Sequence, residues 1–204
     1  MNLSEALHKI AVAYGLNESE LAAYVQEDTI GGWDENPANA KWICGSVWEV
    51  EGQIIYALIR ALKPKLAIEV GSYYGCSAYH IAEALFRNEQ GKLISIDIAF
   101  MYKVPERYAG IIEQVNISLF DYRMPSGCVD FVFEDAMHTA EMTAHAWADF
   151  KENALPGAMI VSHDAVHESV GLTVREGMAR VTPDGLPLLI QPGKCGLGIW
   201  RKPV

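Results

Sequence analysis

The sequence predicts an α/β fold built on a doubly wound, mostly parallel seven-stranded sheet, with one reversed strand near the C-terminus and additional N-terminal helices. Short apolar segments alternate with helical segments over residues 66–180, which is typical of a parallel sheet. The short segments are near-continuous apolar runs, as expected for strands buried on both faces. The last two candidate strands are separated by only a few residues, so they must pair antiparallel.

Six helices are expected from apolar residues at helical spacing and from their end signals. The second begins with an asparagine cap and early acids, and Pro64 and the Pro156-Gly157 pair are expected to stop the third and fifth. The predicted ranges are 3–14, 18–26, 48–62, 77–87, 139–153 and 168–180.

Seven strands are expected between and after these helices. The segments LAIEV, KLISIDI, VDFVFED and AMIVSHD are the clearest, IEQVNISLF is weaker, and LPLLI and GLGIW close a hairpin around PGKC. The predicted ranges are 66–70, 92–98, 112–120, 129–135, 158–164, 186–190 and 196–200.

The chain is expected to form one domain with an N-terminal extension. Its 204 residues suit one sizeable core. We expect residues 48–204 to be the ligand-binding domain, and residues 1–47 to be a helical and loop segment serving as a lid or as a homodimer contact.

Composition excludes several partner classes. The formal net charge is −10, and the 16 Lys and Arg residues are scattered, so nucleic acid is not expected as a partner. No signal peptide or apolar run of membrane-spanning length is visible, so no membrane association is expected. Four cysteines stand without a CxxC pair, which indicates free thiols and a cytoplasmic location; they are Cys44, Cys76, Cys128 and Cys195.

The stretch AIEVGSYYGCSA (residues 67–78) indicates a ligand site at the end of the first strand. Glu69 closes the strand, and Gly71 permits a sharp turn, while Gly75 permits close approach of a ligand or of backbone. Asp97 ends the next strand, where an acid can bind both ribose hydroxyls. The dinucleotide pattern GxGxxG is absent, and two glycines alone would also fit a plain turn.

EVGSYYGCSA resembles motif I of the class I S-adenosylmethionine (SAM)-dependent methyltransferases. More narrowly, it is similar to the E-x-G-[ST]-x-x-G-x-[ST] form found in small-molecule O-methyltransferases. The resemblance covers about residues 50–200 and includes EGQIIYALIRAL, ISID, VDFVFEDAMHT, LPGAMIVSHD and GLGIW. It implies SAM as cofactor and a small molecule as methyl acceptor.

The resemblance also implies cofactor-binding residues by position. The loop after the first strand would border the methionine part of SAM, Asp97 would hold the ribose, and Ile98 or Phe100 would pack against adenine. Asp121 would reach the adenine amino group, although a solvated turn acid is the alternative. The implied set is Glu69, Gly71, Ser72, Tyr73, Gly75, Ser77, Asp97, Ile98, Asp121 and Asp135.

FEDAMHTAE (residues 133–141) resembles the family pattern D-G-x-H-[ST]-Y-[DE], which places Asp135 and His138 in the catalytic positions. Alanines stand in place of the glycine and the tyrosine. His138 is the candidate general base for a hydroxyl acceptor, with a structural histidine as the alternative.

The segment SHD ends the fifth strand, next to the fourth in the expected sheet. We hypothesise that Asp135, His163 and Asp164 bind Mg²⁺ or Mn²⁺, with imidazole ligation favouring the latter. The alternative is that both acids bind cofactor or cap helices while the histidine packs under a loop.

The predicted function is therefore SAM-dependent methylation of a small molecule, on a hydroxyl oxygen. The alternatives are a metal-independent N- or C-methyltransferase, or a SAM-binding module without activity. A nucleic-acid methyltransferase is disfavoured because EDAMH lacks the Asn/Asp-Pro-Pro-aromatic element. Trp33, Trp42 and Trp48 form an aromatic wall over the acceptor or anchor the N-terminal segment on the core.

Overall fold

The computed structural model describes residues 1–30, 47–182 and 187–204. Trp33, Trp42 and Cys44 therefore lie outside the described residues, as does the loop at 31–41. The helices are α1 (Leu3–Tyr14), α2 (Glu18–Glu27), α3 (Glu49–Leu62), α4 (Cys76–Arg87), α5 (Ala140–Asn153) and α6 (Gly171–Val181), with a short 3₁₀ turn η1 (Glu106–Tyr108).

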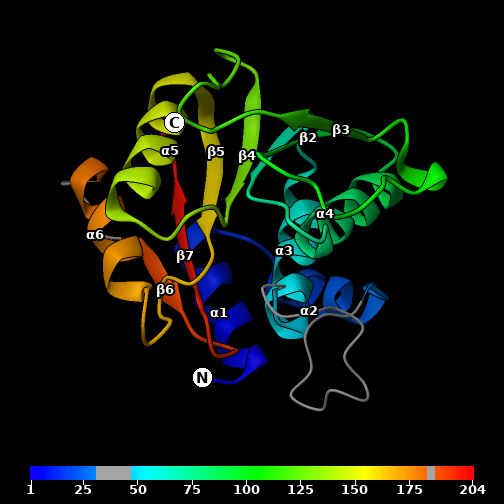
Figure 1. Cartoon of the computed structure of the whole chain (residues 1–204). Helices are drawn as coiled ribbons and strands as arrows, with labels where there is room; N and C mark the ends of the chain where they lie inside the picture. The colour runs from blue at the N-terminus through cyan, green and yellow to red at the C-terminus, as the bar shows by residue number, and fades with distance from the viewer. Residues whose placement is uncertain (31–46, 183–186) are drawn as a thin grey trace.

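The seven strands form a single sheet in the order β3-β2-β1-β4-β5-β7-β6 (Figure 1). β1 to β5 are parallel, and β7 runs antiparallel to both of its neighbours, so the predicted fold class is confirmed. The strands are β1 (Leu66–Val70), β2 (Lys92–Asp97), β3 (Ile112–Asn116), β4 (Val129–Glu134), β5 (Ala154–Ser162), β6 (Leu188–Ile190) and β7 (Leu197–Arg201).

Two strands differ from the prediction. β3 ends at Asn116 because the chain turns back at Ser118, whose carbonyl accepts the N–H groups of Asp121 and Tyr122. β5 starts earlier than expected, and Pro156 and Gly157 lie inside it rather than closing the preceding helix. A register shift between β4 and β5 accommodates them.

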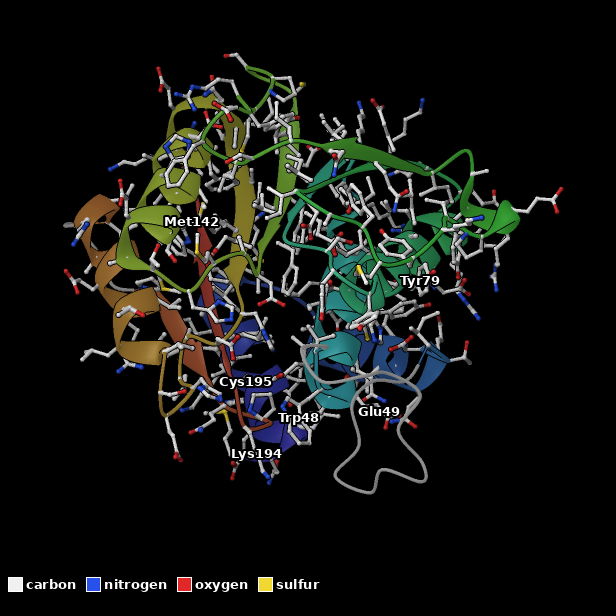
Figure 2. All side chains as sticks on the ribbon, in the orientation of Figure 1. Trp48, Glu49, Tyr79, Met142, Lys194 and Cys195 are labelled. Carbon is white, nitrogen blue, oxygen red and sulfur yellow. The ribbon has the colours of Figure 1, made fainter. Side chains whose placement is uncertain are left out.

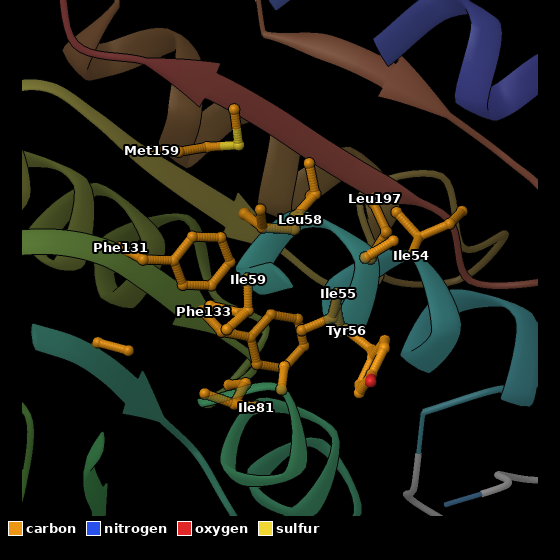
Figure 3. Close-up of a cluster of buried hydrophobic side chains, with 14 of the residues drawn as sticks. Ile54, Ile55, Tyr56, Leu58, Ile59, Ile81, Phe131, Phe133, Met159 and Leu197 are labelled. Carbon is orange, nitrogen blue, oxygen red and sulfur yellow. The ribbon is translucent and has the colours of Figure 1, made fainter. Parts of the chain in front are cut away.

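Helices cover both faces of the sheet, which produces two hydrophobic layers. The apolar face of α3 packs on one layer, where Ile55 and Ile59 lie among Phe131 and Phe133 of β4 (Figure 3). α5 and α6 cover the opposite face (Figure 1), where Trp147 is fully buried. The carboxyl ends of β1, β4 and β5 lie side by side at one edge of the sheet.

The N-terminal helices belong to the same core as the sheet. Leu7, Ile10 and Leu21 are buried in the layer that contains α3, and the Tyr14 hydroxyl donates to the Ile199 carbonyl (2.6 Å). Asn2 and Glu5 form a capping box at the start of α1. A lid or dimer-contact role for residues 1–47 stays a prediction. Among the described residues, no helix has the length and apolarity needed to cross a bilayer.

Candidate active site

A cavity of about 480 Å³ opens at the carboxyl ends of β1, β4 and β5. Such an edge is where doubly wound sheets bind ligands. Its lining comes from the loop after β1, the segments after β4 and β5, and residues next to α3 and β7. The lining residues are Val47, Trp48, Gly71, Ser72, Tyr73, Tyr74, Cys76, Ser77, Asp135, Ala136, His138, His163, Asp164, His167, Val170 and Cys195.

The β1–β2 half of this site consists of residues 71–77 and Asp97. Gly71 has φ +83°, and a Cβ there would overlap the backbone carbonyl of Asp135. Gly75 also has φ +83°, and its Cβ would lie 2.8 Å from the ring of Tyr102. Both positions therefore require glycine, because the loop turns sharply and packs against other parts of the chain.

Asp97 fixes the conformation of this loop. Its Oδ2 accepts the backbone N–H groups of Ser72 (2.7 Å) and Tyr73 (2.8 Å), and its Oδ1 accepts that of Ala99 (3.0 Å). Tyr73 has φ +45°, an unusual conformation that these bonds help to hold. The sequence predicted a ribose contact for Asp97 but not this loop-binding role.

Glu69 lies beneath the loop and is fully buried. Its carboxyl accepts hydrogen bonds from the hydroxyls of Ser77 (2.6 Å) and Ser95 (2.5 Å). Burial raises the pKa of Glu69 to about 7, although the hydroxyl bonds of Ser72, Ser77 and Ser95 oppose the shift. Glu69 thus supports the cavity floor and is not part of its lining.

Four other predicted cofactor residues also lie outside the cavity lining, and one of them is Asp97. Ile98 is 74% exposed just after β2, and its carbonyl accepts the side-chain amide of Asn116. Asp121 is exposed in the turn after β3. Gly75 is buried behind the loop. Their cofactor contacts stay predictions.

The β4–β5 half consists of Asp135, His138, His163 and Asp164. The strands are adjacent, with Glu134 opposite Ser162, so the residues that follow them meet at one edge. Nδ1 of His163 lies 3.2 Å from Oδ1 of Asp135 and 3.3 Å from Oδ2 of Asp164, while Nε2 of His138 lies 2.8 Å from that same Oδ2. The structure therefore brings all four predicted residues together.

Charge pairing dominates this half. Burial lowers the pKa of His163, but Asp135, Asp164 and Glu51 raise it well above its ordinary value. The hydrogen bond to Asp164 raises the pKa of His138. Burial raises the pKa of Asp135, whereas the two imidazoles hold that of Asp164 far below its usual range despite burial. The acids of this cluster therefore stabilise positive charge on the two imidazoles that lie between them.

Sequence reasoning missed several residues of the site. Glu51, in the first turn of α3, is fully buried, and its Oε2 lies 2.9 Å from Nε2 of His163. His167, which carried no motif, and Cys195 also line the cavity. An acid inside the apolar helix segment WEVEGQIIYALIRAL was a readable signal for Glu51.

Trp48 is the one predicted wall tryptophan among the described residues, and it lines the cavity. The Nζ atom of Lys194 lies 5.3 Å from its ring centroid, and Figure 2 shows Trp48 beside Lys194 and Cys195 on the same side of the molecule. Trp48 thus joins the start of α3 to the segment before β7 at the cavity rim.

Comparisons with known proteins agree with this geometry. Residues 68–165 match the family model described as a methyltransferase domain. A search of curated proteins found no match.

Solved structures with the same fold include three methyltransferases. The chain is similar to the O-methyltransferase TomG of Streptomyces achromogenes in complex with SAM, with 19% identity, a TM-score of 0.59 and all of both chains covered. An O-methyltransferase of Bacillus cereus in complex with S-adenosylhomocysteine (SAH) has 14% identity and a TM-score of 0.58 over 97% of each chain. The SAH-bound methyltransferase PaMTH1 of Podospora anserina has 13% identity and a TM-score of 0.58 over 91% of this chain and 94% of that one.

Sheet order and the solved structures show that the chain has the class I methyltransferase fold, and residues 68–165 match a methyltransferase domain. The matched segment includes the loop after β1 and the segments after β4 and β5, so the predicted resemblance to methyltransferases is confirmed over these residues.

Proposed function

We propose that this protein transfers the methyl group of SAM to a hydroxyl oxygen of a small-molecule acceptor. The observation that carries the proposal is the meeting of the two halves in one cavity, a glycine loop on one side and the His138–Asp164 pair on the other. The O-methyltransferases TomG and that of Bacillus cereus, which share the fold and were crystallised with SAM or SAH, support the choice of oxygen.

The cofactor would lie across the tips of β1 and β2. Gly71, Ser72 and Ser77 would border its methionine part, with Tyr73 and Gly75 shaping the loop and Glu69 beneath it. Asp97 would accept the ribose hydroxyls while still holding the loop amides. Adenine would lie beyond β2, where Ile98 is exposed and Asp121 follows the next strand.

Methyl transfer is an in-line displacement. The acceptor oxygen forms a bond to the methyl carbon as the carbon–sulfur bond breaks, and neutral SAH leaves with the bonding electron pair. The hydroxyl proton must also depart. Nε2 of His138 bonds to Asp164, so Nδ1 is the nitrogen that can accept this proton, and Asp164 stabilises the imidazolium that results.

The β4–β5 half also fits a divalent cation. Two carboxylates and an imidazole converge with separations of 3.2 and 3.3 Å, and Asp135, His138 and Asp164 can each offer a ligand atom within 4.8 Å of the others. We propose that Asp135, His163 and Asp164 hold the ion, with Mn²⁺ preferred over Mg²⁺ because of the imidazole. When bound, the ion would lower the pKa of an acceptor hydroxyl.

His138→Ala tests the proposed reaction. SAH formation over a panel of phenolic and sugar acceptors should fall about 10²–10⁴-fold, the usual value of general base catalysis. SAH affinity by calorimetry should stay within about twofold. The matched control is His8→Ala, which removes an exposed imidazole on α1 and should change neither quantity.

Two outcomes would contradict the proposal. A parallel loss of SAH affinity in His138→Ala would make the residue structural. SAH binding by the wild type without product from any acceptor would favour a SAM-binding module that lacks activity. The cation is judged separately: full activity in a strong chelator would contradict a role for the ion and leave His138 as the proposed base.

A further inference from the structure

Glu51 occupies a position where a carboxylate is costly unless each of its oxygens is bonded. The residue is fully buried in the first turn of α3. Oε1 accepts the backbone N–H of Gly196 (2.6 Å), and Oε2 lies 2.9 Å from Nε2 of His163. Isolated buried charges are strongly unfavourable, so both bonds are needed to keep this acid in place.

The Glu51 contact determines which nitrogen of His163 keeps its proton when the other nitrogen binds a cation. A carboxylate accepts hydrogen bonds and does not donate them, so the hydrogen between Glu51 and His163 belongs to Nε2. Nδ1 is the atom that faces Asp135 and Asp164, at 3.2 and 3.3 Å. Without an ion, Nδ1 also carries a hydrogen, which the two acids accept; when a cation displaces that proton, Nε2–H stays with Glu51 and the Nδ1 lone pair faces the cation.

We infer that Glu51 is a positioning residue for the divalent-cation site, holding His163 in the tautomer and orientation that present Nδ1 as a ligand. The inference rests on the cation site proposed above. A carboxylate behind a metal-binding histidine is a recurrent arrangement, and its loss commonly weakens metal affinity 10–100-fold. Glu51 itself is fully buried and is not part of the cavity lining.

The position of Glu51 is itself fixed from two sides. α3 supplies the residue, and the segment before β7 supplies the Gly196 N–H. Gly193 of that segment lies so close that a Cβ there would be 3.0 Å from Oε1. The acid therefore connects α3 to the end of β5 and to the start of β7, each more than 100 residues from Glu51 in sequence.

Glu51→Gln is the discriminating variant. The glutamine oxygen can still accept the Gly196 N–H, but its NH₂ would face Nε2 of His163 and make that nitrogen an acceptor. The ring proton would then move to Nδ1, between Asp135 and Asp164. Mn²⁺ affinity, measured by calorimetry with SAH present, should fall 10–100-fold while SAH affinity is unchanged.

Glu49→Gln is the matched control, because it removes the same charge from an exposed position in the same helical turn. It should leave Mn²⁺ affinity within about twofold of wild type. A structural salt bridge would lower the melting temperature of Glu51→Gln without changing Mn²⁺ affinity in the folded protein, and that result would overturn the inference.

A second measurement does not depend on the folding of Glu51→Gln. The ¹⁵N spectrum of histidine-labelled wild type, with the diamagnetic ion Cd²⁺ bound, should show His163 protonated at Nε2; the His163→Gln spectrum assigns the signal. A proton on Nδ1 would overturn the inference. If SAH-loaded wild type binds neither Mn²⁺ nor Cd²⁺, the proposed cation site and this inference are both wrong. The proposed methyl transfer is tested separately, by SAH binding and by product formation.

Discussion

Each half of the cavity has a buried acid at a strand end, but the groups that surround the acid differ between the halves. In the β1–β2 half, Glu69 is surrounded by serine hydroxyls, and burial raises its pKa to about 7. In the β4–β5 half, Asp164 faces two imidazoles, which hold its pKa far below the usual range. For Glu69 the neutral donors do not offset the desolvation of the carboxylate, whereas for Asp164 the two imidazoles do.

This difference separates the tasks of the two halves. The β1–β2 half is a cradle of backbone N–H groups and hydroxyls, suited to holding a ligand without changing its charge. The β4–β5 half is a cluster of acids and imidazoles, suited to moving a proton or holding a cation. Variants in one half should therefore alter binding and variants in the other should alter turnover.

Asp97→Ala should separate the halves with the largest effect. It removes the acceptor for the N–H groups of Ser72 and Tyr73 and the proposed partner of the ribose. Hydrogen bonds to a charged group contribute about 1.5–3 kcal/mol each, so SAH affinity by calorimetry should fall about 10²–10⁴-fold. Asp121→Ala, which removes a turn acid, should cost less than about tenfold. Wild-type affinity in Asp97→Ala would refute the proposed cofactor position.

Glu69→Gln tests the comparison through the pH dependence of the free energy of unfolding. An acid whose pKa is raised by folding binds more protons in the folded state between its two pKa values, here about 4.5 and about 7. The wild-type free energy of unfolding should therefore fall, relative to that of Glu69→Gln, as pH rises across this window. The expected change is about 3 kcal/mol.

Urea unfolding at a series of pH values measures this difference. Glu113→Gln, at an exposed position on β3, is the control and should run parallel to wild type. If the Glu69→Gln curve is parallel as well, Glu69 is ionised throughout and the contrast with Asp164 disappears.

The positions of the residues in the β1–β2 half could be predicted from the sequence because their determinants are local, while their cofactor contacts stay predictions. Glu69, Gly71 and Ser77 lie within nine residues, and Asp97 ends the next strand, so spacing alone brings them to one edge. The sheet order and the reversed strand followed from the same alternation of apolar segments. The errors lay at strand ends, where a turn at Ser118 and a register shift near Pro156 prevailed over the apolar pattern.

The β4–β5 half was predicted only in part. Strand order placed Asp135 beside Asp164, but no local pattern shows that Glu51 reaches His163 across 112 residues or that Gly196 holds Glu51. Such contacts depend on how α3 and β7 pack on the sheet, which is tertiary information. In the structure, acids lie within hydrogen-bond distance of both ring nitrogens of His163. The motif SHD alone does not predict this.

Gly71 lies at the junction of the two halves, and its replacement tests whether they are mechanically coupled. A Cβ at this position would overlap the Asp135 carbonyl, and the residue has φ +83°. Gly127→Ala is the matched control, because φ is +70° there and nothing lies within 4 Å of the added carbon. Both variants carry the backbone strain, so the difference between their free energies of unfolding isolates the overlap. About 2 kcal/mol of lost stability is expected for it in urea unfolding.

Because the carbonyl that must move belongs to Asp135, Gly71→Ala should also weaken Mn²⁺ binding, whereas Gly127→Ala should not. Equal stability and equal Mn²⁺ affinity in the two variants would show that the halves move independently.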